Sequence, residues 1–187
     1  MRIPNAGLFA IACTIWGSTW LAITFQLGTV APEVSVAYRF AIAGAIVAAW
    51  CVAIRQPLAF AAREHLWLAA LGATFFGLNY VGVYWAERYV ASGLVAVVFS
   101  TIVFMSPVGM RAFFGEALTV RMLAAAGMGV TGVALLFLPE LSAASHGGSA
   151  ALGIGIALLA TVFATFGNLI AVRNHRAGLP TLPSTAW

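Results

Sequence analysis

The chain has 187 residues, of which 63% are apolar and 7% are charged. Soluble domains carry about 25% charged residues, so this composition excludes an ordinary water-soluble fold and indicates a protein that crosses a membrane several times. The nine basic residues are all arginines and the five acidic residues are all glutamates. The net charge of +4 therefore comes from a few loop arginines, which indicates contact with a membrane rather than with nucleic acid.

Apolar segments long enough to span a bilayer follow one another along the chain. The first, residues 6–26, continues past Trp16 and Trp20, which makes it too long and too bulky for a cleaved signal peptide. The later predicted spans are residues 33–54, 66–87, 91–114, 119–138 and 150–172. Glycine, proline and charged residues mark the breaks between them. The sequence thus predicts an all-α membrane protein, a polytopic helix bundle.

The placement of the arginines predicts the orientation of the bundle, because basic residues in short loops stay on the cytoplasmic side. With the N-terminus inside, Arg88 alone falls on the external side, and Arg39 lies within the second span. The cytoplasmic set is then Arg2, Arg55, Arg63, Arg111, Arg121, Arg173 and Arg176. We therefore predict a multi-pass protein of the cell (inner) membrane with a cytoplasmic N-terminus.

The sixth segment resembles the first when the two are superposed, with Thr161 on Thr14 and Pro180 on Pro32. A repeat unit of five helices has an odd number of spans, so a second copy enters the membrane from the opposite face, as in inverted-repeat transporters. We predict a first unit over residues 1–140 and the start of a second over residues 149–187, truncated after its first helix.

Several short motifs occur in a characteristic order relative to these helices. They are Trp16-Gly17-Ser18-Thr19-Trp20, Tyr38-Arg39-Phe40, Ala91-Ser92-Gly93-Leu94-Val95-Ala96, Ser106-Pro107 and Gly115-Glu116-Ala117-Leu118-Thr119. In this respect the chain resembles the EamA domain of the drug/metabolite transporter superfamily. The resemblance implies one five-helix EamA domain followed by the beginning of a second. It also implies relatives with ten helices that export amino acids and other small metabolites.

Polar and aromatic side chains inside the spans are the candidate substrate contacts. Trp16 and Trp20 share one helix face and either line a cavity that stacks against a substrate or pack against neighbouring helices. Asn79 lies in mid-span, with Tyr80 and Tyr84 on an adjoining face. Because an unpaired amide in hydrocarbon is costly, Asn79 faces the interior, where it bonds either a substrate or another helix.

Arg39 and Tyr38, at the start of the second span, complete the predicted substrate-binding set. Burial of an arginine is costly unless the charge is paired or hydrated. Arg39 therefore either snorkels to the surface or attracts a substrate carboxylate in a hydrated vestibule, balanced by Glu87. Pro107 removes a backbone hydrogen bond from the fourth span and is a candidate hinge. Glu116 is expected to cap the fifth helix.

Other classes of function fit the sequence less well. An intramembrane serine protease lacks a base, because His65, His146 and His175 all fall in loops. The two cysteines lie in apolar runs, and no metal-ligand spacing occurs, so we predict no metal, no cofactor and no nucleic-acid partner. The sequence is compatible with a homodimer. The alternative to a transporter is an inactive fragment or a non-transporting membrane scaffold.

Overall fold

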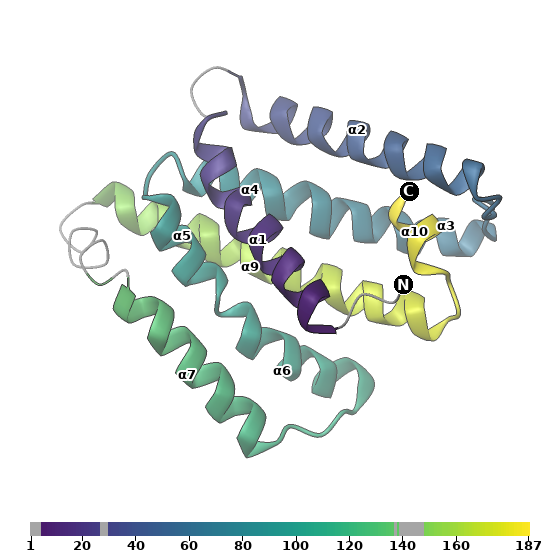
Figure 1. Cartoon of the computed structure of the whole chain (residues 1–187). Helices are drawn as coiled ribbons and strands as arrows, with labels where there is room; N and C mark the ends of the chain where they lie inside the picture. The colour runs from purple at the N-terminus through teal and green to yellow at the C-terminus, as the bar shows by residue number, and fades with distance from the viewer. Residues whose placement is uncertain (1–4, 27–29, 137, 139–147) are drawn as a thin grey trace.

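The computed structural model describes residues 5–26, 30–136, 138 and 148–187. Within these ranges every regular element is a helix and none is a strand (Figure 1). This confirms the predicted all-α polytopic bundle. Arg2, Glu140 and His146, three residues on which the predictions drew, lie outside the described residues.

The first two spans are uninterrupted helices. Helix α1 covers Asn5–Thr24 and helix α2 covers Pro32–Ala53. Pro32 occupies the first turn of α2, where its missing N–H is not needed, and Glu33 beside it suits the positive end of the helix dipole. The end of α1 and the start of α2 therefore bring Gln26 and Glu33 to the same end of the bundle.

The third and fourth spans are each interrupted near the middle. The third consists of α3 (Ala62–Leu71), the π-helical turn η1 (Gly72–Leu78) and α4 (Asn79–Ala86), and it begins four residues earlier than predicted. The fourth consists of α5 (Ser92–Phe99) and α6 (Ile102–Phe114). The sequence predicts a continuous helix for the third span and, for the fourth, a helix whose candidate hinge is Pro107.

The remaining helices are α7 (Val120–Leu136), α9 (Gly148–Arg176) and the short α10 (Thr181–Thr185). The hydroxyl of Thr119 accepts a hydrogen bond from the Met122 N–H at the start of α7 (3.2 Å). Thr119 is therefore the N-cap residue, and the expectation that Glu116 caps this helix was wrong. Helix α9 runs four residues beyond its predicted end at residue 172.

Five of the described helical segments are long and apolar enough to cross a membrane: Ala6–Thr24, Pro32–Ala53, Ala62–Ala86, Ser92–Phe114 and Ser149–Arg176. The described part of α7 has 17 residues, which is about the lower limit for a span. Together they support the multi-pass architecture.

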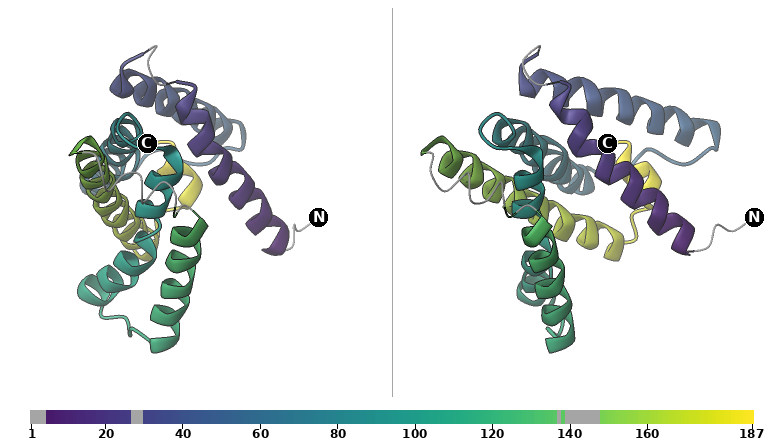
Figure 2. Two further views of the ribbon diagram at one scale, coloured as in Figure 1. Left: turned by 90° about the vertical axis from the view of Figure 1, so that its left-hand side faces the viewer. Right: turned by 60° about the vertical axis from the view of Figure 1, so that its left-hand side comes forward.

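Helix α9 lies at the centre of the bundle, alongside α3, η1 and α4, and it also contacts α5 and α6 (Figures 1 and 2). Small residues allow these close contacts. A Cβ atom placed on Gly167 would lie 2.5 Å from Cβ of Phe75, and one on Gly82 would lie 2.9 Å from Cβ of Ala160. The backbones of α9 and of the third span are therefore almost in contact.

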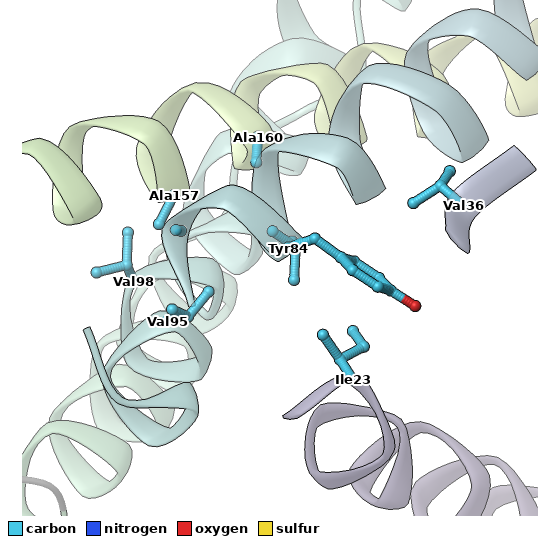
Figure 3. Packing of buried hydrophobic residues seen from close by; sticks show 9 residues of the cluster. Ile23, Val36, Tyr84, Val95, Val98, Ala157 and Ala160 are labelled. Carbon is cyan, nitrogen blue, oxygen red and sulfur yellow. The ribbon is translucent and has the colours of Figure 1, made fainter. Parts of the chain in front are cut away.

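Helix α1 is attached much more loosely. Of its apolar window 6% is buried, against 44% for α9. Helix α1 crosses in front of α4 and α9 in Figure 1 and reaches the core mainly through Ile23, which is 1% exposed. Figure 3 shows Ile23 and Val36 on either side of the Tyr84 ring, while Val95, Val98 and the alanines of α9 pack nearby.

Candidate functional site

The interruption of the third span centres on Asn79. The backbone N–H of Asn79 donates to the carbonyl of Thr74, five residues back, and so misses the carbonyl of Phe75, four residues back. The side-chain amide donates to that Phe75 carbonyl instead (Nδ2 to O, 3.1 Å). A carbonyl can only accept, so the amide nitrogen must face Phe75, and Oδ1 points elsewhere.

Asn79 Oδ1 is a buried acceptor without a hydrogen-bond partner. The residue is 3% exposed. An unsatisfied buried polar atom costs roughly 1–3 kcal/mol, and the large majority of buried side-chain polar atoms in proteins have a hydrogen-bond partner. π-helical turns of this kind occur frequently at functional sites.

The interruption of the fourth span lies at Ser100 and Thr101, between α5 and α6. Both hydroxyls donate to backbone carbonyls three residues back, Ser100 to Val97 (2.6 Å) and Thr101 to Val98 (2.7 Å). Such bonds compete with the helical ladder and favour a local bend. Phe99, directly before the break, forms an edge contact with Trp20 of α1 at 5.4 Å between ring centroids.

A small cavity lies where these two interruptions approach α1. Its lining consists of Trp16, Thr19, Trp20, Ile23, Asn79, Tyr80, Val83 and Phe99. The volume of about 10 Å³ is room for about one water molecule, so a metabolite fits only after the helices move apart. Trp16 stands at the edge of the cavity and is 51% exposed. Four of the predicted contacts, Trp16, Trp20, Asn79 and Tyr80, thus come together.

Arg39 reaches the same region from α2. Its guanidinium lies 5.0 Å from the ring centre of Tyr80 and 5.6 Å from that of Phe40. Cations over aromatic faces at this distance are attracted by the ring electrons. Tyr80 therefore stands between the Arg39 charge and the cavity.

The carboxylate of Glu87, which the sequence analysis offered as a counter-charge for Arg39, is buried and accepts no hydrogen bond. The ion pairs among the described residues join other side chains, Arg173 to Glu64 and Arg176 to Glu116. Within that part of the chain, Arg39 is balanced by aromatic rings rather than by Glu87.

Two other predicted contacts lie outside the cavity. The ring of Tyr84 is fully buried in the core, and its hydroxyl donates to Gln26 Oε1 at 2.8 Å (Figure 3 shows the ring). Tyr38 is 68% exposed on α2. Pro107, the predicted hinge, lies inside α6, while the break in this span falls at Ser100 and Thr101.

Sequence reasoning missed several lining residues. Thr19 and Ile23 follow Trp16 at steps of three and seven residues, which is the spacing of one helix face, so the tryptophan pair could have indicated them. Val83 follows Asn79 by one turn in the same way. Phe99 carries no such signal, because its place depends on the break after it.

A larger groove of about 530 Å³ lies between α2, η1 and the last residues of the chain. Small apolar residues, among them Ala37, Ala41, Gly44 and Gly72, form most of its wall. It contains no charged side chain that could orient a polar ligand. Among the residues described, no group of three or more His, Cys, Asp or Glu side chains could hold a metal ion.

Comparison with known proteins identifies the family of this chain. The model of the EamA-like transporter family matches residues 5–138. Protein PagO of Salmonella typhimurium is 24% identical over 147 residues, which are 78% of this chain and 48% of that protein. An "uncharacterized transporter in trpA 3'region" of Buchnera aphidicola is 27% identical over 93 residues, 50% of this chain and 31% of that protein. This chain therefore spans half or less of the length of these relatives. No solved structure matches it.

Proposed function

We propose that this chain, which belongs to the EamA-like transporter family, carries the substrate-contacting cavity of a membrane transporter that exports small metabolites, amino acids among them, by alternating access. The family comprises transporters, which favours this activity over an enzyme. The observation that carries the proposal is the meeting of two interrupted spans at one cavity with an unpaired amide oxygen.

Interrupted helices are the usual form of a binding site within a membrane. Irregular backbone is tolerated at membrane depth where it is buried in protein or lines a cavity, and discontinuous helices hold the substrate sites of many secondary transporters. Here η1 precedes Asn79 and the α5–α6 break follows Phe99. Both residues line the same cavity, which supports a ligand site at this place.

The lining favours a substrate with an N–H donor and an apolar or planar body. Asn79 Oδ1 can accept from a substrate amino group, and the faces of Trp16 and Trp20 can stack against its apolar part. Arg39, behind Tyr80, can attract a carboxylate. An amino acid carries all three features, so it is the substrate class that we propose.

We propose that the cavity opens alternately to the two sides of the membrane. Its small volume corresponds to a closed form, and the break at Ser100 and Thr101 is a place where the fourth span can bend, with Pro107 one to two turns further on. The arginine count supports a cytoplasmic N-terminus in a cell (inner) membrane.

Transport of radiolabelled amino acids by purified protein in liposomes tests the proposal. We expect Asn79→Leu, which keeps the side-chain size, to lose most transport, whereas Asn168→Leu, a mid-span amide outside the cavity lining, keeps it. Equal transport by Asn79→Leu and the wild type contradicts the assignment of the site. Absence of transport by the wild type over the whole panel favours the alternative, an inactive fragment or a scaffold.

A further inference from the structure

Glu87 is an unpaired acid that is buried at one end of the bundle. It follows directly on the third span, which ends at Ala86, and it is 9% exposed. Within the described part of the chain, neither carboxylate oxygen has a hydrogen-bond partner. A charged carboxylate in such a place is strongly disfavoured, because burial removes its hydration and no donor replaces it.

The charged groups that the structure describes at this end are engaged elsewhere. On α2, Glu33 accepts a hydrogen bond from Trp85 Nε1 (2.6 Å), and Arg39 stacks on Tyr80. Next to Glu87 in the chain, Arg88 lies 4.7 Å from the Trp85 ring centre.

Among the described residues, the other helices here carry no charge that could compensate Glu87. No ionisable side chain except Cys13 occurs in α5, in α1 with the turn after it (residues 6–26), or in residues 149–160 of α9. Burial alone raises the pKa of the Glu87 carboxyl from 4.5 to about 7.

Glu87 lies on the face of α4 that leads to the cavity. Asn79, Val83 and Glu87 follow at steps of four residues, and the first two line the cavity. The helical rise places Glu87 about 12 Å from Asn79 along the axis. Directly beyond it the chain is tightly packed, since a Cβ on Gly153 of α9 would lie 2.8 Å from Cβ of Tyr89. This end of the path is therefore closed.

We propose that Glu87 is a proton-binding site that links closure of this end of the cavity to the uptake of one proton. On closure the hydrated carboxylate accepts a proton from water and is buried as the neutral acid. On opening, water reaches the group, the O–H bond breaks and the proton returns to solution. The inference rests on the proposed alternating access, since it concerns the same path.

The linkage has a definite sign. Between the pKa of a hydrated glutamate and that of the buried one, the closed form binds one proton more than the open form. Each rise of one pH unit in that interval therefore shifts the equilibrium up to tenfold toward the open form. Glu87→Gln, which imitates the neutral acid, removes this dependence and keeps this end closed.

Infrared spectroscopy of the protein in lipid nanodiscs tests the protonation itself. We expect the C=O band of a protonated carboxyl to persist in the wild type at about pH 6 and to disappear with a midpoint near pH 7. Glu87→Gln removes the band, whereas Glu33→Gln, an exposed acid at the same end, keeps it. A band that Glu87→Gln leaves unchanged, or a midpoint near that of a free glutamate, overturns the proposal. This readout needs no transport, so it is independent of the proposed function.

Cysteine accessibility tests the link to closure. In a background without native cysteines, Val83→Cys reports whether this end is open to a soluble maleimide. Thiol ionisation also changes with pH, so the quantity compared is the ratio of the alkylation rates with Glu87 and with Glu87→Gln. We expect this ratio to rise several-fold from about pH 6 to pH 8. A constant ratio overturns the linkage even if the infrared band is present.

Discussion

The charged side chains at the two ends of the bundle have different partners. At the arginine-rich end, Arg173 of α9 forms a two-point ion pair with Glu64 and stacks on Trp67, 4.6 Å from the ring centre. Arg176, one turn further on, pairs with Glu116. These contacts tie the central helix to the first turns of α3 and to the segment between α6 and α7.

At the arginine-poor end uncharged aromatic side chains donate the polar contacts. Tyr84 donates to Gln26 and Trp85 donates to Glu33, while the carboxylate of Glu87 is left without a partner. One end is therefore fastened by paired charges, whereas the other is closed by packing around an acid that must first be neutralised. Ion pairs are largely insensitive to pH near neutrality, whereas a buried acid is sensitive.

Removal of Arg173 should have the largest effect. Arg173→Ala leaves Glu64 partly buried without its counter-charge and deletes the stacking on Trp67. We expect the melting temperature in detergent to fall by several degrees, together with loss of transport. Arg111→Ala removes an exposed arginine of the same predicted side and should change little. Equal falls in the melting temperature of the two variants would show that the paired Arg173 contributes no more to stability than an exposed arginine.

The pH dependence of stability should come mainly from the other end. Because the pKa of Glu87 is raised on folding to about 7, the folded protein holds the proton more tightly than the unfolded chain does. The free energy of unfolding therefore falls as pH rises from about 5 through 7 and levels off above. Glu87→Gln should flatten this decline, and Glu33→Gln should not. A melting temperature that rises over this interval in the wild type would contradict the burial of an unpaired acid.

Arg39 differs from the charges at both ends, because its guanidinium lies over aromatic rings near the cavity. If it guides a carboxylate, Arg39→Gln should weaken transport of carboxylate-bearing substrates severalfold and that of neutral ones little. Arg39→Lys should be partly tolerated, since a long-range attraction needs only the charge. Initial rates for a charged and a neutral substrate measured side by side give the answer. Equal losses for both would instead indicate a structural role.

The smallest effect is expected at Arg176, whose ion pair with Glu116 is about half exposed on both sides. Exposed pairs contribute only about 0.5 kcal/mol and are screened by salt. Arg176→Ala should therefore shift the melting temperature slightly at low ionic strength and not at all in about 0.5 M salt. A shift as large as that of Arg173→Ala would show that α9 is fastened at Arg176 as well.

The sequence was sufficient to predict the helices and the family, because long apolar runs and their motifs are local signals. It also indicated Trp16, Trp20, Asn79 and Tyr80, whose spacing places them on helix faces directed inward. The partners of Gly153 and Gly167 of α9, in the turn after the third span and in that span itself, were not visible, since they depend on contacts distant in the sequence.

The same limit explains what was missed in the site. The π-helical turn before Asn79 and the break after Phe99 leave no mark in the apolar periodicity of these two spans. Tyr84 looked like a cavity residue by spacing, yet its hydroxyl donates to Gln26, two residues beyond the end of α1. Glu87 looked like a counter-charge for Arg39, yet burial isolates its carboxylate.

Substrate protection of a cysteine in the cavity tests whether the substrate binds there. Thr19→Cys places a thiol in the cavity lining, and Thr14→Cys places one on an exposed part of the same helix. In proteoliposomes of cysteine-free background, we predict that an excess of a transported amino acid slows alkylation at position 19 severalfold and leaves position 14 unchanged. Identical rates at position 19 with and without a substrate that is demonstrably transported would contradict the placement of the substrate at this cavity.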